Sequence, residues 1–321
     1  MRLKKRTEKK VIVVTRETRA DNLRKRFNSV DQAAFFVEKR GGNFKDYLVE
    51  DSNYKASVSN LGDNIFDWGN VQFIDRSYLP NFVFGPEDTV IAIGQDGLVA
   101  NTLKYLKDGQ PLIGVNPDPD RWDGVLLPFT VDQMEEVVGS VLLGRHRTKE
   151  VTMAKAQLND GQEILGVNDL FFGKQSHTSA RYIIGIDGQQ ERHSSSGVIV
   201  STGLGSTGWL KSLLHGASAI VESLGRVSSH HPEPRAPGPA LSIPWDTPDL
   251  YFTVREPFPS QTTQGDLVFG KIRPGSPLTI RSLMPDDGVI FSDGLENDFI
   301  EFNSGSEATI TTAEIRGQLV V

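Results

Sequence analysis

Cysteine is absent from the 321-residue sequence. The chain therefore has no disulfide framework, no thiol nucleophile and no cysteine-ligated metal. No segment approaches the roughly eighteen consecutive apolar residues of a transmembrane helix, so we expect no membrane partner. The basic N-terminal segment, residues 1–10, lacks the apolar core of a secretory signal, and a cytoplasmic location is expected. A formal net charge of −7 argues against a broad nucleic-acid-binding surface.

The hydrophobic content and the length of the chain indicate a globular protein of two domains. With 38% hydrophobic residues the chain can bury a sizeable core, and its length leaves room for two domains of roughly 150 residues. Strands alternate with helices over residues 1–144, which predicts an α/β domain with a parallel sheet. Residues 145–321 consist mainly of short alternating segments separated by turns, which predicts an antiparallel β-rich domain.

Local patterns place individual elements within this outline. Buried strands are expected at residues 11–15, 90–93 and 111–115, and helices at residues 19–27, 31–40 and 130–143, with Thr130 as N-cap of the last. Residues 47–75 are polar and are expected to be irregular, with a short strand at residues 71–74. In the second domain we expect one helix at residues 206–224 and an exposed loop at residues 228–239.

The first informative stretch joins a buried strand to a helix. The apolar residues 90–93 are followed by Gly94-Gln95-Asp96-Gly97 and then by apolar residues at helical spacing. Open α/β sheets bind ligands at such a point, where the carboxyl ends of strands meet helix N-termini. Gly94 and Gly97 would let the backbone approach a ligand, and Asp96 could direct a carboxylate at a hydroxyl group. The alternative is a tight turn in which Asp96 only caps the helix.

A second stretch, residues 201–208, follows a β-branched strand and is rich in glycines and hydroxyl groups. Amides freed by glycines such as Gly205, with the hydroxyls of Thr202, Ser206 and Thr207, would form a cradle for phosphate or adenine at a helix N-terminus. Its glycine spacing matches G-x-G-x-x-G only formally, because no regular βαβ unit surrounds it. A P-loop is excluded, since tryptophan stands where the lysine is required. The alternative is a structural loop with an N-cap.

A third stretch places Asn168 and Asp169 side by side within the apolar segment 164–173. Polar groups in such a segment need partners, so a ligand or a turn must satisfy them. The amino group of adenine and ribose hydroxyls are suitable partners for an amide beside a carboxylate. A plain Asx turn is the alternative.

Taken in this order, the three stretches resemble the motifs of the ATP-dependent NAD kinases. Those proteins carry a Gly-Gly-Asp-Gly turn, an Asn-Glu pair and a Thr-Pro-Thr-Gly-Ser-Thr loop. The resemblance runs from about residue 11 to residue 310 and looks closest to the mitochondrial-type branch and its bacterial relatives. The residues that carry this closer likeness are Ser195-Ser196-Gly197, Trp209 and Val254-Arg255-Glu256-Pro257.

The resemblance implies an active site in the cleft between an N-terminal α/β domain and a C-terminal β-rich domain. It implies ATP as phosphate donor with Mg²⁺, NAD as substrate, and a homo-oligomer. Asp96 would lie beside the attacking ribose 2′-hydroxyl, with Gly94, Gln95 and Gly97 around the nucleotide. Asn168 and Asp169 would hold the nucleoside part of NAD. The remaining binding residues implied for adenine or phosphates are Thr202, Gly205, Ser206 and Thr207.

The sequence departs from the family pattern at several positions. Gln95 replaces the second glycine of the turn, and Leu98 replaces the threonine that usually follows it. Asp169 is one methylene shorter than glutamate, and Gly203-Leu204 replaces Pro-Thr. Two alternatives to an NAD kinase therefore stand: a related kinase acting on a sugar or nucleoside, and a nucleotide-binding protein that has lost turnover.

Overall fold

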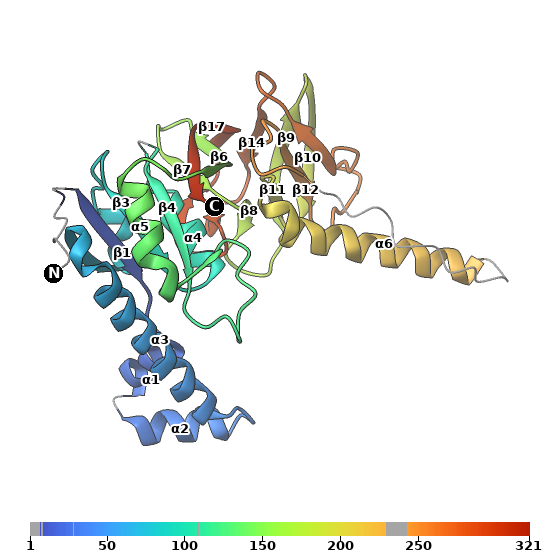
Figure 1. Cartoon of the computed structure of the whole chain (residues 1–321). Helices are drawn as coiled ribbons and strands as arrows, with labels where there is room; N and C mark the ends of the chain where they lie inside the picture. The colour runs from blue at the N-terminus through green and yellow to red at the C-terminus, as the bar shows by residue number, and fades with distance from the viewer. Residues whose placement is uncertain (1–6, 8, 28, 108, 229–242) are drawn as a thin grey trace. The chain divides into compact units, whose positions relative to one another are not determined.

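The computed structural model describes residues 7, 9–27, 29–107, 109–228 and 243–321 (Figure 1). The described residues form two compact units. The first contains the residues up to Lys149 together with Gly317–Val321, and the second is Glu150–Arg316. The predicted domains, residues 1–144 and 145–321, stay a prediction.

The first unit is built on a parallel sheet. Strands β2 (Asn70–Asp75), β1 (Lys10–Thr15), β3 (Thr89–Ile93) and β4 (Pro111–Asn116) lie next to one another in this order. The same edge of β4 pairs with β5 (Phe129–Thr130) and with the last residues of β17 (Glu307–Val320). All five side chains of β3 are buried, as expected for a central parallel strand. The strands predicted at residues 11–15, 71–74, 90–93 and 111–115 are confirmed.

Helices accompany these strands along the chain. They are α1 (Arg19–Phe27), α2 (Val30–Glu38), α3 (Phe44–Ile65), α4 (Asp96–Leu103) and α5 (Met134–Leu142), with 3₁₀ helices η1 (Phe66–Trp68), η2 (Arg76–Asn81) and η3 (Val131–Gln133). Thr130 forms a capping box with Gln133 and so begins the helical segment that the sequence predicts there.

The prediction that residues 47–75 are irregular is wrong, because α3 covers the first part of this segment. Asn43 caps the helix by accepting a hydrogen bond from the Lys45 amide. Two positions on the buried side of α3 are the acids Glu50 and Asp51, which pair with arginines instead of packing as apolar residues. These acids interrupt the apolar periodicity from which a helix is recognised.

The second unit is built mainly from antiparallel strands. Its six-stranded sheet has the order β13 (Phe269–Ile272), β12 (Leu250–Val254), β11 (Val198–Ser201), β8 (Asp169–Lys174), β15 (Gly288–Ser292), β16 (Leu295–Glu301). The other strands run β10 (Gln189–Ser195), β9 (Ala180–Ile186), β14 (Leu278–Ser282) and β17, while β6 (Thr148–Leu158) pairs with β17 and with β7 (Glu163–Gly166).

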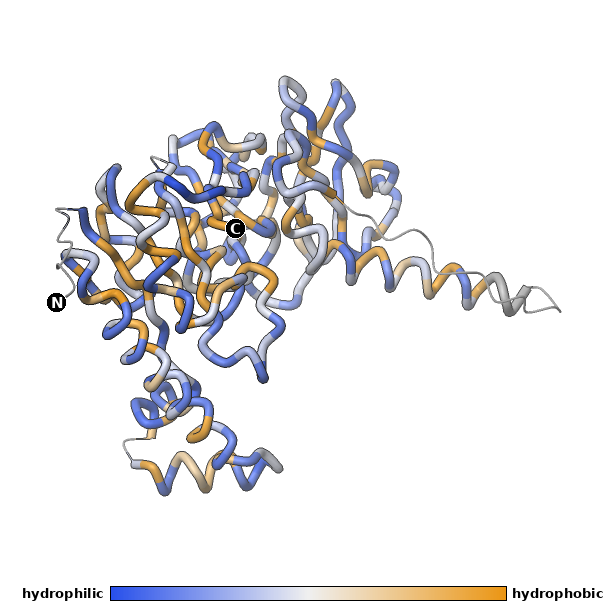
Figure 2. Tube along the Cα trace, viewed as in Figure 1, coloured by the Kyte–Doolittle hydropathy of each residue, from blue (hydrophilic) through white to orange (hydrophobic). Residues whose placement is uncertain are grey.

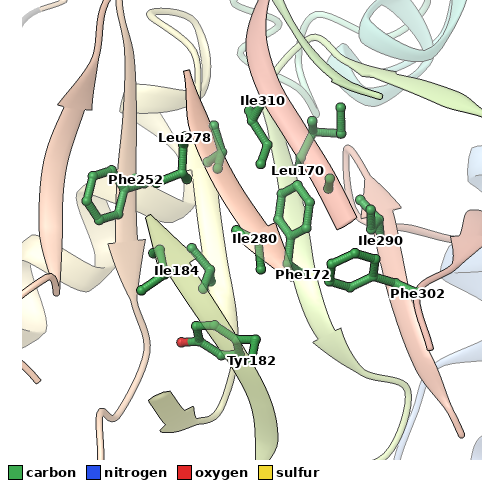
Figure 3. Packing of buried hydrophobic residues seen from close by; sticks show 14 of the residues in the cluster. Leu170, Phe172, Tyr182, Ile184, Phe252, Leu278, Ile280, Ile290, Phe302 and Ile310 are labelled. Atoms are coloured by element: carbon green, nitrogen blue, oxygen red, sulfur yellow. The ribbon is translucent and has the colours of Figure 1, made fainter. Parts of the chain in front are cut away.

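A hydrophobic core lies between the strands of this unit. Alternate residues of both sets of strands point into it, as Figure 3 shows for Phe172 on β8, Ile184 on β9 and Phe252 on β12. The predicted fold class, a parallel α/β part followed by an antiparallel β-rich part, is thereby confirmed.

The helix predicted in the second half is present as α6 (Trp209–Ser228). A 3₁₀ turn, η4 (Gly205–Thr207), precedes it and moves its start three residues beyond the expected one. Beyond its first turns the helix leaves the strands of its own unit, and apolar and polar residues alternate along it (Figures 1 and 2). The loop predicted at residues 228–239 lies, apart from Ser228, outside the described residues. None of the described helices combines the length and apolar content that crossing a bilayer requires.

Candidate active site

The Gly94–Gly97 turn connects β3 to α4. The Gly94 amide donates to the Val115 carbonyl (3.1 Å), and a Cβ on Gly94 would lie 2.9 Å from Leu98 Cδ2, so a larger residue here would require the Leu98 side chain to shift. Gln95 is the N-cap residue of α4 with φ −116° and ψ 163°, an extended conformation open to any L-residue. Glutamine in place of the family's glycine therefore puts no strain on the turn.

Asp96 is the first residue of α4, and its carboxylate binds a different segment of the chain. Oδ1 accepts a hydrogen bond from the Leu126 amide (2.8 Å) and Oδ2 accepts one from the Val125 amide (3.2 Å). These two bonds reach outside α4, so Asp96 does more than cap its own helix. A carboxylate has about four lone-pair sites, so two remain for a substrate hydroxyl. The two amides fix the direction in which those sites point.

The loop that supplies these amides was not identified from the sequence as part of the site. It approaches β4 so closely that a Cβ on Gly114 would lie 1.9 Å from the Leu126 carbonyl oxygen. Gly124, with φ +61°, turns the chain just before the amides. The Asp-Gly pair at residues 123–124, following a strand at the ligand-binding edge of a parallel sheet, was the available signal.

Asn168 lies in the turn between β7 and β8, Asp169 is the first residue of β8, and another acid holds this turn. The Asp293 carboxylate accepts hydrogen bonds from the amides of Val167 (3.2 Å), Asn168 (2.6 Å) and Asp169 (3.3 Å). Asp293 itself has a left-handed backbone, with φ 54°, and its amide donates to the Asp169 carbonyl (3.0 Å). A long-range contact therefore organises this turn, in place of the local Asx turn that was the alternative.

The Asp169 side chain is buried, with the residue only 7% exposed. Burial and the neighbouring negative charge of Asp293 raise the pKa of Asp169 from 3.8 to about 7. Among the residues that the structure describes, none donates a hydrogen bond to this carboxyl group. A buried carboxyl that titrates near neutral pH is a candidate functional group.

The loop at residues 202–207 is bound directly to this turn. The Thr202 amide donates to the Asn168 carbonyl (3.0 Å), and its hydroxyl donates to the Val167 carbonyl (2.6 Å) while accepting from the Gly205 amide (3.1 Å). A Cβ on Gly205 would lie 1.9 Å from the Asn168 carbonyl oxygen. The structure thus brings together two of the stretches that the sequence singled out.

The hydroxyls of this loop have different surroundings. Thr202 and Ser206 are buried, and the Ser206 hydroxyl donates to the Gly203 carbonyl (2.6 Å). Thr207 is exposed just before α6 begins. The first two side chains therefore hold the loop in shape, and the ligand contacts predicted for all three stay a prediction.

Trp209 and Arg255, which the resemblance also singled out, meet beside this loop. The Trp209 ring stacks on Phe171 with centroids 5.8 Å apart, and the Arg255 guanidinium lies 5.5 Å from the Trp209 ring. Asp96 and its loop belong to the first unit, whereas the other stretches belong to the second. The site that the resemblance places between the domains stays a prediction.

No protein-family model matches the chain. Among known proteins, mitochondrial NAD kinase 2 of Rattus norvegicus is 23% identical over 367 aligned residues, which cover 94% of the chain and 84% of that protein. This match extends over the whole set of motifs described above. Over nearly its whole length the chain is similar in sequence to a mitochondrial NAD kinase.

Solved structures of NAD kinase family members have the same fold. An NAD kinase from Archaeoglobus fulgidus in complex with ATP superposes with a TM-score of 0.55 at 15% identity, covering 97% of the chain and 93% of its own. Yeast NADH kinase complexed with NADH gives a TM-score of 0.56 at 12% identity, covering 98% and 84%. At these identities the two structural similarities establish the fold of the chain and nothing more.

Proposed function

We propose that the chain transfers the γ-phosphoryl group of ATP to the 2′-hydroxyl of the adenosine ribose of NAD, giving NADP and ADP. The observation that carries the proposal is the carboxylate of Asp96, fixed by two backbone amides at a strand-to-helix turn of an NAD kinase fold. The similarity to a mitochondrial NAD kinase supports this activity over the alternatives, a sugar or nucleoside kinase and a binding protein without turnover.

In this reaction Asp96 is the general base. One carboxylate oxygen accepts the proton of the ribose 2′-hydroxyl while that hydroxyl oxygen forms a bond to the γ-phosphorus. The bond from the γ-phosphorus to the bridging oxygen breaks, and ADP leaves. Phosphoryl transfer needs mainly alignment and charge neutralisation from the protein. The Val125 and Leu126 amides provide alignment by holding the carboxylate in one orientation.

The binding roles follow the stretches that the resemblance identified. Gly94, Gln95 and Gly97 would contact the nucleotide at the turn. Asn168 and Asp169 would bind the nucleoside part of NAD, since Asp169 is buried and in need of a hydrogen-bonding partner. The loop around Thr202, Gly205, Ser206 and Thr207 would contact adenine or phosphate.

Mg²⁺ would be bound together with the phosphates of ATP. Among the described residues, no group of three or more histidine, aspartate or glutamate side chains could hold a metal ion. Such a group is not required for Mg²⁺, which keeps several waters and is commonly bound through substrate phosphates and one or two carboxylates. When bound, the ion neutralises charge on the phosphate oxygens.

The activity is tested by incubating the chain with Mg-ATP and NAD and measuring the products by mass spectrometry. We expect NADP and ADP in equal amounts, and no phosphorylated product from a panel of sugars and nucleosides. Binding of ATP and NAD without product would contradict the proposal. NADH offered in place of NAD establishes the preferred redox form.

Asp96→Asn tests the base itself. The substitution is nearly isosteric, so folding and ATP binding should survive, while turnover falls by about 10²–10⁴-fold, the usual contribution of a general base. Asp63→Asn, at an exposed position of α3, is the matched control and should leave turnover unchanged. An Asp96→Asn enzyme with full turnover would refute the mechanism.

A homo-oligomer and a cytoplasmic location complete the proposal. On α6 the apolar residues Ile220, Val221 and Leu224 are 63%, 69% and 63% exposed, and burying them against a second copy would remove this surface from water. Light scattering tests the molar mass in solution. The cytoplasmic location stays a prediction from the sequence.

A further inference from the structure

Tyr54 on α3 joins the ends of two neighbouring strands beside the Gly94–Gly97 turn. Its hydroxyl donates a hydrogen bond to the Ile93 carbonyl (3.0 Å), the last of β3, and accepts one from the Arg16 amide (2.9 Å), just after β1. β1 and β3 are adjacent parallel strands, so one buried hydroxyl bridges their carboxyl ends. Tyr54 is 5% exposed, and burial raises its pKa to about 12. The hydroxyl therefore keeps its proton and remains a donor to the strand end.

Arg16 extends this contact to the turn. Its guanidinium lies 4.9 Å from the Tyr54 ring centroid and pairs with Glu50 at 3.0 Å. Both charged side chains are less than a tenth exposed, so the pair is shielded from water. The Arg16 Cδ would lie 3.6 Å from a Cβ built on Gly94. The Arg16 side chain, held by Tyr54 and Glu50 of α3, thus lies beside the first residue of the turn.

The same helix holds the loop on the other side of Asp96. Ser57 donates a hydrogen bond to the Pro117 carbonyl (2.8 Å), and Arg121 binds the Asp46 carboxylate with two nitrogens (2.8 and 3.1 Å). This loop leads, within a few residues, to the two amides that bind the Asp96 carboxylate. Helix α3 therefore contacts both backbone segments that fix the position of Asp96.

We propose that Tyr54 is a positioning residue for the reaction, acting through the backbone of Ile93 and Gly94 on Asp96. The inference rests on the proposed function, since it assigns Tyr54 a part in phosphoryl transfer. Misplacement of a reacting group by about 1 Å can lower the rate by about 10²-fold. Removal of a single hydroxyl from Tyr54 loosens the strand end from which the turn begins.

Tyr54→Phe keeps the ring and removes the two hydrogen bonds. We expect kcat to fall by about 10–100-fold, while KM for ATP and for NAD changes by less than about twofold, at a temperature where the variant is fully folded. Tyr47→Phe is the matched control on the same helix. The Tyr47 ring faces Arg19 at 4.1 Å, and its hydroxyl makes no hydrogen bond with the described residues, so kcat should be unchanged.

Two further measurements separate positioning from a merely structural role. In an Asp96→Asn background, adding Tyr54→Phe should lower kcat no further, because the residue that Tyr54 positions is already disabled. Hydrogen exchange of peptides covering residues 122–128 should be faster in Tyr54→Phe than in the wild type, because the amides held by Asp96 lose that restraint. This second readout needs no activity, so a chain that makes no NADP would refute the proposed function and still test the inference.

Three outcomes would overturn the inference. They are an unchanged kcat in Tyr54→Phe, a kcat loss that multiplies with that of Asp96→Asn, and unaltered exchange at residues 122–128.

Discussion

Replacing Asp169 by asparagine should make the stability of the chain less sensitive to pH. In the folded chain the pKa of Asp169 is raised from 3.8 to about 7 by burial and by Asp293. The folded state therefore holds this proton more tightly than the unfolded state does. Its contribution to stability is fully present below about pH 4 and is lost as pH rises towards and through 7.

The size of the effect follows from the shift. At about 1.36 kcal/mol per pH unit, ionising this carboxyl in the folded chain costs about 4 kcal/mol above pH 7. Most of that cost accumulates between pH 5 and pH 8. Asparagine has nearly the same shape and no charge, so the variant avoids the cost. The free energy of unfolding of Asp169→Asn minus that of wild type should thus increase by about 2–3 kcal/mol between pH 5 and pH 8.

Urea unfolding of both proteins at several pH values measures this difference. Titrating groups that do not interact with Asp169 contribute equally in the two proteins and cancel. Asp63→Asn, at an exposed position of α3, is the control, and its difference from wild type should stay flat with pH. If the difference in unfolding free energy between Asp169→Asn and wild type is also independent of pH, the raised pKa of Asp169 and its two causes, burial and the charge of Asp293, are refuted.

Two further substitutions test the loops around the site. Gly114→Ala should destabilise the fold by about 1–3 kcal/mol in thermal melts, because the new Cβ would lie 1.9 Å from the Leu126 carbonyl oxygen. Gly97→Ala is the control and should cost no stability, because its Cβ would have nothing within 4 Å. Equal melting points for the two variants would contradict this prediction. Thr202→Val keeps the side-chain shape and removes the buried hydroxyl that holds the loop, so it should cost about 1–3 kcal/mol, whereas Thr207→Val, at an exposed position, should cost much less. A Thr202→Val protein as stable as the wild type would show that the hydroxyl is not needed there.

The sequence predicts the parts of the fold that depend on local pattern. The strand at residues 90–93 and its turn were predictable because an apolar run and two glycines stand next to each other in the chain. Helix α3 was missed because Glu50 and Asp51 occupy buried positions, and their arginine partners lie on a different segment. A local pattern cannot show that a charge is buried in a pair.

In the candidate site too, residues with a local sequence signal could be predicted, whereas contacts between distant segments could not. Asn168 and Thr202 could be picked out from their composition, but their contact depends on two strands pairing across more than thirty residues. Asp293 could not be picked out, since its role is to bind the amides of a turn more than 120 residues earlier in the chain. The same holds for Gly114, whose lack of a side chain matters only because Leu126 folds back on it.

The pairing of β17 with β4 means that the sheet of the first unit can be completed only late in synthesis at the ribosome. Gln318 and Leu319 pair with the edge of β4, and Val320 belongs to the core of the first unit. These residues are translated only after the whole of the second unit. Until then part of the β4 edge lacks its partner strand, and an unpaired edge is a template for association between chains. A fragment that ends at Lys149 would keep this edge permanently open, so its expression should yield more aggregate than the full chain.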